Sequence, residues 1–294
     1  MSTSAVPAER TTAGDYLELT KPRITLMVVL TALMGYVLAS PGAPEALPLL
    51  AALVGTGLVA AGASALNMVI ERRVDARMRR TQDRPLPAGR LRAPEAAAFA
   101  LALTSLGLAV LTWFSGTLAA GVALVTWASY VFLYTPLKVR TSLATIVGAF
   151  PGALPPVIGW AAARHAIDPG AFILFAILFL WQIPHFLAIA WIYREDYARG
   201  GLPMLPVLDP EGRITGRQAV AHALALLVVS LTPPVAGLAG APYLVGALLL
   251  GLGFAAVAVA AAVQRTLVWA RRLFLASLLY LTLLCALLFV DRLL

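Results

Sequence analysis

Long apolar segments dominate this sequence and decide what it can fold into. Runs of apolar residues with almost no charge recur between residues 22 and 290. A helix of about 20 residues crosses a ~30 Å hydrocarbon core, and it satisfies its own backbone hydrogen bonds where water is absent. We therefore predict nine transmembrane helices, at residues 22–40, 47–70, 94–113, 117–135, 142–162, 170–193, 218–236, 242–263 and 272–290.

The composition agrees with a polytopic membrane protein. Hydrophobic residues make up 61% of the 294 residues and charged residues only 12%, a balance that soluble globular domains do not have. The net charge of +8 raises the question of nucleic acid, but the basic residues lie in the loops between apolar spans. Membrane topology explains them better, and we expect no nucleic-acid partner. The single cysteine, Cys285, excludes a disulfide framework and a cysteine-based metal site.

The basic residues also predict an orientation. With nine spans, 20 of the 22 Lys and Arg residues fall on one side, and only Arg164 and Arg292 fall on the other. Because positive charge stays in the cytoplasm, we expect a cytoplasmic N-terminus and an external C-terminus, in the cell (inner) membrane. Residues 1–13 are rich in Ser, Thr and Ala and predict a disordered tail, and residues 14–294 predict a single transmembrane domain.

A polar stripe ends the second predicted helix. Asn67, Glu71 and Asp75 recur every four residues, and each such step turns only ~40° around a helix, so the three share one face. Amide and carboxylate oxygens suit Mg²⁺, and the arginines that follow, among them Arg80 and Arg84, suit a phosphate bound to the same ion. The alternative is a helix end whose carboxylates merely pair with arginines. We favour a site, because an unpartnered polar group at the edge of an apolar span is costly.

The sixth predicted helix contains polar residues deep inside its apolar run. Gln182 and His185 lie there beside Pro184, which loosens the backbone. An imidazole within a membrane span is a functional candidate, and its alternative is a histidine that hydrogen-bonds a carbonyl of a neighbouring helix. At the inner mouth Asp196 is a candidate acidic ligand, with Glu195 as its competitor.

Shorter segments complete the candidate set. The loop after the fourth predicted helix carries Tyr134, Lys138 and Arg140, and Lys21 precedes the first helix. Both segments could bind a diphosphate or carry ordinary positive-inside charge. Residues 148–160 concentrate glycine and proline, which predicts a broken or closely packed helix that lines a cavity.

Together these motifs resemble one known family. Residues 67–86 resemble the first aspartate-rich motif of the UbiA-type intramembrane prenyltransferases. The segments 19–23, 134–138 and 148–160 resemble the same family, and the Trp-Gln-x-Pro-His-Phe element at 181–186 resembles its haem-modifying branch.

The resemblance implies an all-α bundle of nine transmembrane helices around a central cavity open to the cytoplasm. It implies that a farnesyl group passes from farnesyl diphosphate, with addition of water, to a vinyl group of protohaem IX, giving haem O and diphosphate, with Mg²⁺ as cofactor. The implied residues are Asn67, Glu71, Asp75 and Asp196 for catalysis and metal, Arg80, Arg84, Lys138 and Arg140 for diphosphate, and His185, Gln182 and Tyr134 for the haem pocket. The implied partners are both substrates, the lipid bilayer, and a haem A synthase or the assembly factors of a terminal oxidase.

Two departures and two rival interpretations stand beside this resemblance. Glu71 occupies a position where the family usually has aspartate, and Glu195 with Asp196 is all that remains of a second acidic motif, which puts a site with two magnesium ions in doubt. One rival is a UbiA-type enzyme that prenylates a phenolic or quinone precursor. The other is a transporter of an anionic substrate, which predicts alternating access and no metal-bearing carboxylates.

Overall fold

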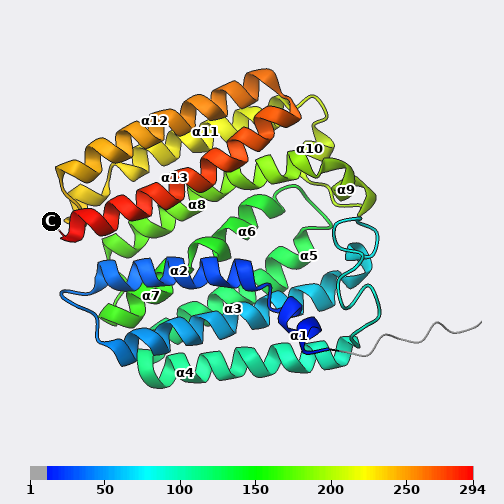
Figure 1. The fold of residues 1–294 in the computed structure, drawn as a ribbon, viewed down its shortest axis with the longest axis horizontal. Helices are drawn as coiled ribbons and strands as arrows, with labels where there is room; N and C mark the ends of the chain where they lie inside the picture. The colour runs from blue at the N-terminus through cyan, green and yellow to red at the C-terminus, as the bar shows by residue number, and fades with distance from the viewer. Residues whose placement is uncertain (1–11, 294) are drawn as a thin grey trace, which may run out of the picture.

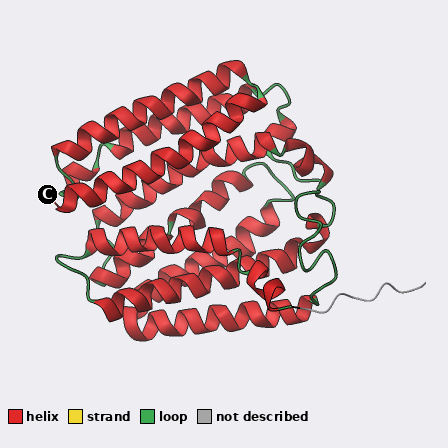
Figure 2. Cartoon of the chain, viewed as in Figure 1, coloured by secondary structure: helices red, strands yellow, loops and turns green. Residues whose placement is uncertain are grey.

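The computed structural model describes residues 12–293, and this part of the chain is helical with no strand (Figure 1, Figure 2). The predicted all-α polytopic fold is confirmed. The elements are α1 (Ala13–Leu19), α2 (Pro22–Ala39), α3 (Ala46–Asp75), α4 (Ala93–Ala128), the π-helix η1 (Ser129–Tyr134), α5 (Thr135–Leu137), α6 (Ala144–Ala153), α7 (Pro155–Arg164), α8 (Pro169–Ile192), α9 (Arg194–Arg199), α10 (Leu205–Leu208), α11 (Arg213–Ser230), the 3₁₀ helix η2 (Pro233–Ala236), α12 (Ala241–Gln264) and α13 (Leu267–Leu293).

The predicted N-terminal tail, residues 1–13, lies outside the described residues except at its end. There Thr12 caps α1 through a reciprocal capping box with Asp15, and Ala13 begins the helix.

Within the described chain, eight helical segments are long and apolar enough to cross a membrane. One of them, Ala93–Leu137, has 45 residues and covers two of the predicted spans, 94–113 and 117–135. Gly116 interrupts it with φ 86° and ψ 162°. The count of nine spans therefore stays a prediction, and it depends on what the chain does at Gly116.

Both ends of this 45-residue segment lie beside the same end of α3. Near its start, Ala96 clusters with Met68, and near its end, Thr135 bonds to Asn67. A straight helix of that length would be ~68 Å long, so its two ends could not both contact one turn of α3. The chain reverses at Gly116, and α4 forms two arms.

The helix predicted to be broken, within residues 148–160, is broken between α6 and α7. α6 ends at Ala153 and α7 begins with Pro155 and Pro156, whose rings supply no backbone N–H donor. α7 then packs closely on α2, because a Cβ at Gly159 would lie 1.9 Å from the carbonyl oxygen of Ala32. Only glycine allows this contact between the two backbones.

Two groups of helices make up the bundle. In one group α8 packs with α11 and α13, and α12 packs with the same two helices; in the other, α3 and α7 each pack with both α2 and α4 (Figure 1). α8 also contacts α6, which links the two groups. The segments that connect the spans at one end, namely α1, residues 76–92, α9 and α10, lie together, and we call this the α9 end. The candidate site lies there.

Candidate active site

The polar stripe lies on one buried face of α3. This helix has 30 residues and continues beyond its apolar part as far as Asp75, so the predicted spacing is helical throughout. The relative exposure of Asn67 is 2%, of Glu71 5% and of Asp75 1%. Three polar side chains buried at the end of an apolar helix require partners, because each would otherwise lose its hydration without replacement.

Each stripe residue meets one cation that comes from a different segment. Lys21 precedes α2, Lys138 follows α5, and Arg84 lies in the loop after α3. The pairs are Asn67 Oδ1 with Lys21 Nζ at 2.8 Å, Glu71 Oε2 with Lys138 Nζ at 3.0 Å, and Asp75 Oδ2 with Arg84 Nη1 at 2.8 Å. The fold therefore gathers three positive charges along the stripe. Of these, Arg84 and Lys138 were predicted to bind diphosphate.

Lys21, for which the sequence leaves open diphosphate binding or ordinary positive-inside charge, belongs to this cluster. Its backbone is left-handed, with φ 47°, at the N-cap of α2, and this uncommon conformation turns the chain between α1 and α2. Desolvation, and then repulsion from Arg84, lowers the pKa of Lys21 to about 7. An anion bound beside it would stabilise its charged form.

The π-helix η1 fixes the segment that carries Lys138. Asn67 Nδ2 donates to Thr135 Oγ1 at 3.1 Å, and Thr135 Oγ1 in turn donates to the carbonyl of Tyr130 at 2.8 Å. Short π-helices recur at functional sites because the extra residue redirects the side chains that follow. Here η1 joins the second arm of α4 to the stripe.

Glu71 supplies the observation that bears on a metal ion. Its Oε1 is buried and has no hydrogen-bond partner within residues 12–293. A buried carboxylate oxygen without a donor is costly, and a hard cation would satisfy it. No group of three or more His, Cys, Asp and Glu side chains in the described chain is arranged for a metal. The stripe has two carboxylates and an amide, which is an oxygen donor set of the kind that Mg²⁺ accepts.

Asp196, the candidate acidic ligand at the inner mouth, has partners of its own. Its carboxylate accepts the backbone N–H groups of Arg79 at 3.0 Å and Arg80 at 3.1 Å, and it pairs with Arg199. Burial would raise the pKa of Asp196, but the hydrogen bonds from Arg199 and the two amides outweigh it and lower that pKa. Both oxygens are thus engaged in fastening the loop 76–92 to α9, and this arrangement does not support the predicted role as a metal ligand. Asp196 is buried and Glu195 exposed, so only Asp196 faces inward.

The remaining diphosphate candidates differ in their surroundings. The guanidinium of Arg80 lies 5.0 Å from the ring centre of Tyr193 and 5.7 Å from that of Tyr197. Arg140 is exposed. Neither forms an ion pair with a stripe carboxylate, unlike Arg84 and Lys138.

Gln182 and Tyr134 lie against α6. Gln182 Nε2 donates to the carbonyl of Ala149 at 3.3 Å, and a Cβ at Gly152 would lie 2.0 Å from Gln182 Oε1. A Cβ at Gly148 would lie 2.6 Å from the ring of Tyr134. The glycines of α6 therefore make room for both predicted haem-pocket residues.

His185 lies at the interface of α8 with α13, not against α6. Its Nδ1 is 2.8 Å from Ser277 Oγ, and its ring stacks on Trp181 with centroids 4.8 Å apart and lies 5.1 Å from Phe274. The partner is a hydroxyl rather than the carbonyl of the alternative interpretation. The structure therefore does not group His185 with Gln182 and Tyr134. Its second ring nitrogen makes no hydrogen bond within the described residues.

Comparison with known proteins gives a consistent answer over nearly the whole chain. The profile of the UbiA prenyltransferase family matches residues 28–290. A protein named protoheme IX farnesyltransferase from Solibacter usitatus is 50% identical over 287 residues, covering 95% of this chain and 98% of that protein. One of the same name from Anaeromyxobacter sp. strain Fw109-5 is 44% identical, covering 99% and 97%.

Solved structures show the same fold at low sequence identity. A structure described for digeranylgeranylglyceryl phosphate synthase has a TM-score of 0.80 at 18% identity and covers 95% of this chain and 97% of that one. A UbiA homolog from Archaeoglobus fulgidus bound to GPP and Mg²⁺ has a TM-score of 0.66 at 16% identity, covering 93% and 99%. The family predicted from the motifs is thus confirmed, and the chain belongs to the UbiA prenyltransferase family.

Proposed function

We propose that this protein transfers a farnesyl group from farnesyl diphosphate to a vinyl group of protohaem IX, with addition of water. The name shared by the full-length relatives supports the substrate pair. The observation that carries the chemistry is the buried stripe of Asn67, Glu71 and Asp75, each paired with a cation from another segment. Such a site suits a diphosphate that leaves an allylic carbon.

The diphosphate binds at the stripe through Lys21, Arg84 and Lys138. Lys138 and Arg84 form ion pairs with Glu71 and Asp75, and Lys21 donates to the amide oxygen of Asn67, so all three cations lie along the stripe. Asn67, Glu71 and Asp75 would hold Mg²⁺, which would supply a Lewis acid to offset the charge of the leaving group. Fixed charges of this kind stabilise the transition state because they need no reorganisation during reaction.

Bond cleavage and bond formation balance without an oxidant. The bond between C1 of the farnesyl group and the diphosphate oxygen breaks, and the diphosphate leaves with the electron pair. The resulting allylic cation bonds to the terminal carbon of the vinyl group. Water adds to the other vinyl carbon and releases a proton, which gives the hydroxyl of haem O. The site must restrict water until the allylic cation has met the vinyl group.

The haem side of the site includes Gln182 and Tyr134 against α6. Both are held by close contacts with glycines of that helix, which is the kind of support that keeps a binding residue in one rotamer. His185 offers an imidazole nitrogen from the α13 side of α8. We assign these residues to protohaem binding, and Arg80 and Arg140 to attraction of the diphosphate. Asp196 acts on the site by holding the loop that carries Arg80.

The protein spans the membrane several times, and we propose the cell (inner) membrane with the α9 end in the cytoplasm. The charge distribution supports this orientation, since Lys and Arg residues concentrate in the connecting segments of that end. The product is a haem that stays in the bilayer. A haem A synthase or the assembly factors of a terminal oxidase are therefore the partners that we propose.

Chromatography of the pigments extracted from membranes tests this function. Membranes from cells that express the protein should contain haem O, whereas membranes from cells with an empty vector or with Asp75→Asn should not. A prenylated phenol or quinone without haem O would favour the quinone-type rival. Energy-dependent uptake of an anion without a new prenylated product would favour a transporter.

A further inference from the structure

A second basic feature of the α9 end is a cleft of about 450 Å³ outside the stripe. It is bounded by the loop after α3, by α9, and by the connection from α12 to α13. Its lining residues are Arg79, Arg80, Trp191, Ile192, Tyr193, Arg194, Glu195, Asp196, Arg199, Arg265 and Leu267. Five arginines face two carboxylates, and Asp196 is already engaged by two amides and Arg199. The cleft therefore has an excess of positive charge.

Four of these arginines have no ion-pair partner among the described residues: Arg79, Arg80, Arg194 and Arg265, all of them exposed. Exposed arginines at the cytoplasmic side of a membrane protein are common, so charge alone does not define a site. Two further features distinguish this cleft from ordinary loop charge.

The first feature is the backbone of Arg265. Its φ is 51°, in the left-handed region that residues other than glycine seldom adopt. Lys21, one of the three cations of the stripe, is one of the two other described non-glycine residues with positive φ. Such conformations cost free energy and cluster at functional sites.

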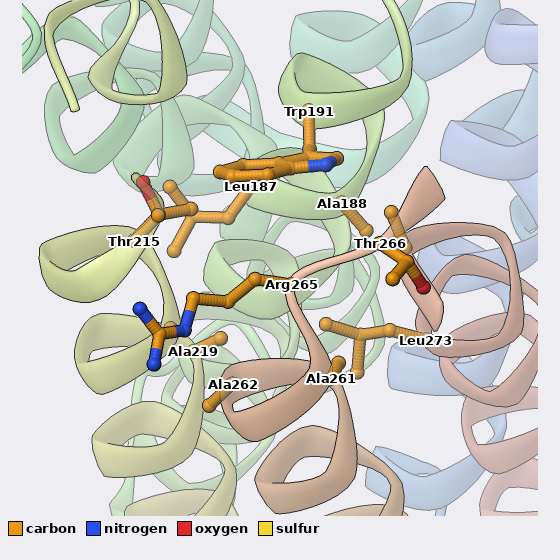
Figure 3. Close-up of a pocket in the computed structure, with 13 residues that line it drawn as sticks. Leu187, Ala188, Trp191, Thr215, Ala219, Ala261, Ala262, Arg265, Thr266 and Leu273 are labelled. Carbon is orange, nitrogen blue, oxygen red and sulfur yellow. The ribbon is translucent and has the colours of Figure 1, made fainter. Parts of the chain in front are cut away.

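The second feature is the aromatic wall formed by Trp191. The guanidinium of Arg194 lies 5.1 Å from the centre of this ring. A Cβ at Gly212 would lie 2.3 Å from the ring, so Trp191 is packed closely on a residue that must be glycine. Trp191 and Arg265 also line a small pocket of about 40 Å³ between α8, α11, α12 and α13, whose other walls are largely apolar (Figure 3). The cleft thus combines arginine guanidinium groups with the closely packed ring of Trp191.

We infer that this cleft binds the two carboxylates of the porphyrin substrate, with Arg194 and Arg265 as the principal contacts. Guanidinium groups bind carboxylates through paired hydrogen bonds, and they stack on flat aromatic systems. A porphyrin with propionate side chains offers both a flat aromatic ring and carboxylates. The diphosphate has its own three cations at the stripe, and of the arginines that line the cleft only Arg80 is assigned to it. This inference rests on the proposed function.

The position of the cleft agrees with a substrate that reaches the stripe. Arg79 is four residues from Asp75, and four residues of extended chain span at most ~14 Å. Asp196 joins the loop of Arg79 directly to α9, which begins with Arg194. A flat molecule held by its carboxylates in the cleft can therefore extend toward the stripe.

Binding of haem B and of its dimethyl ester to the purified protein in phosphatidylcholine nanodiscs tests the inference. The ester keeps the ring, the iron and the vinyl groups but lacks the two negative charges. The wild type should bind the free acid at least tenfold more tightly, the size expected for losing one charge-assisted hydrogen bond. Arg194→Gln and Arg265→Gln should each reduce that preference, and the double variant should bind acid and ester equally.

Arg272→Gln is the matched control. Arg272 also stacks on a tryptophan, 4.6 Å from the ring of Trp269, at the same end of the bundle, but it lines neither the cleft nor the pocket. It should keep the full preference for the free acid. The three single variants and the double variant should all bind farnesyl diphosphate as the wild type does, because the stripe is unchanged.

Several results would overturn the inference. Equal binding of acid and ester by the wild type would do so, as would variants that lose acid and ester binding in parallel. Loss of farnesyl diphosphate affinity with haem binding intact would assign the cleft to the diphosphate instead. Haem O formation by the wild type reports separately on the proposed function. If the wild type makes haem O but binds haem B and its dimethyl ester equally well, only the carboxylate-binding role of the cleft is refuted.

Discussion

Among single residues, Asn67, Glu71 and Asp75 of the α3 stripe matter most for the proposed chemistry. These three side chains are buried, each has one cationic partner, and one oxygen of Glu71 is left without a donor. Ion pairs of this kind are weak evidence for stability, because burying two charges costs about as much as their attraction returns. Their value here lies in holding three cations close to oxygen donors before a substrate arrives.

Asp75→Asn tests the stripe as a metal and diphosphate site. The substitution keeps the shape but removes the charge, so we expect haem O formation to fall at least ~100-fold, corresponding to ~2.7 kcal/mol of transition-state stabilisation. Asp75→Ala, Asn67→Ala and Glu71→Ala should behave similarly, and the wild type should require Mg²⁺. Asp83→Asn is the control, since Asp83 is an exposed residue in the adjoining loop. Near-normal turnover by Asp75→Asn, with correct folding, would remove the stripe from the mechanism.

His185→Ala tests the haem side. If His185 belongs to the haem pocket, the variant should lose haem affinity while its affinity for farnesyl diphosphate stays that of the wild type. Ser277→Ala provides the comparison, because it removes the hydrogen bond to His185 Nδ1, together with one to the carbonyl of Phe274 in the same helix, and leaves the imidazole in place. Absorbance titration with haem B and a farnesyl diphosphate binding assay separate the two substrates. Unchanged haem titration with normal product would leave His185 as a packing residue between α8 and α13.

At the scale of elements, the position of the site depends on contacts between segments distant in sequence. The Asp196 carboxylate holds the loop 76–92 to α9. Gln182 of α8 donates to a carbonyl of α6 and packs on a glycine of that helix, which holds α6 against α8. α2 and α7 meet backbone to backbone at Gly159. Each of these contacts predicts a measurable consequence.

Asp196→Ala should release the loop 76–92. Hydrogen bonds from backbone amides to a carboxylate contribute roughly 1.5–3 kcal/mol each, so the loop should open and its many arginines should become accessible to trypsin. Because the pKa of Asp196 is lowered in the folded protein, its contribution is complete above the ordinary pKa of an aspartate and is lost as the pH falls through the lowered value. Protease protection of the wild type should therefore persist to mildly acidic pH. Equal cleavage rates of variant and wild type would contradict this role.

Gly159→Ala should separate α2 from α7. The added Cβ would lie 1.9 Å from a backbone oxygen, which cannot move as a side chain can. We expect a destabilisation of ~1–3 kcal/mol or more, measured as a lower midpoint of thermal unfolding in detergent. Gly121→Ala is the matched control, because nothing lies within 4 Å of a Cβ there, and it should be neutral or slightly stabilising. Equal midpoints for the two variants would refute the close packing.

The sequence predicts the local patterns of these elements and misses their long-range contacts. The stripe is visible because helical spacing is a local property, and the break at residues 148–160 is visible because proline and glycine act locally. The contact of Lys21 with Asn67 joins residues 46 apart through an uncommon turn, and His185 reaches Ser277 across 92 residues. The role of Asp196 was missed for a further reason. Its partners are mainly backbone amides, which leave no signature in the sequence.

At the scale of the whole molecule, the topology depends on the reversal at Gly116. Nine spans place the two termini on opposite sides of the membrane, whereas eight spans place them on the same side. The distribution of 20 basic residues against two supports nine. The two contacts of the 45-residue segment with the end of α3 support the same count.

Reporter fusions test this topology. A reporter that is active only outside the cytoplasm, fused after Leu294, should be active, and the same reporter fused within the loop 76–92 should be silent. A reporter fused at Gly116 should be active if the chain reverses on the external side. A silent C-terminal fusion would mean that one of the nine spans does not cross the membrane.

Farnesyl transfer to haem is measured with purified protein in nanodiscs, supplied with farnesyl diphosphate, haem B and Mg²⁺. We expect haem O and diphosphate in equal amounts, with one oxygen atom from ¹⁸O-labelled water in the new hydroxyl. We also expect removal of Mg²⁺ to stop formation of both products. Diphosphate released without any modification of haem would contradict the proposed transfer, because the site would then cleave the allylic substrate without delivering the farnesyl group to the porphyrin.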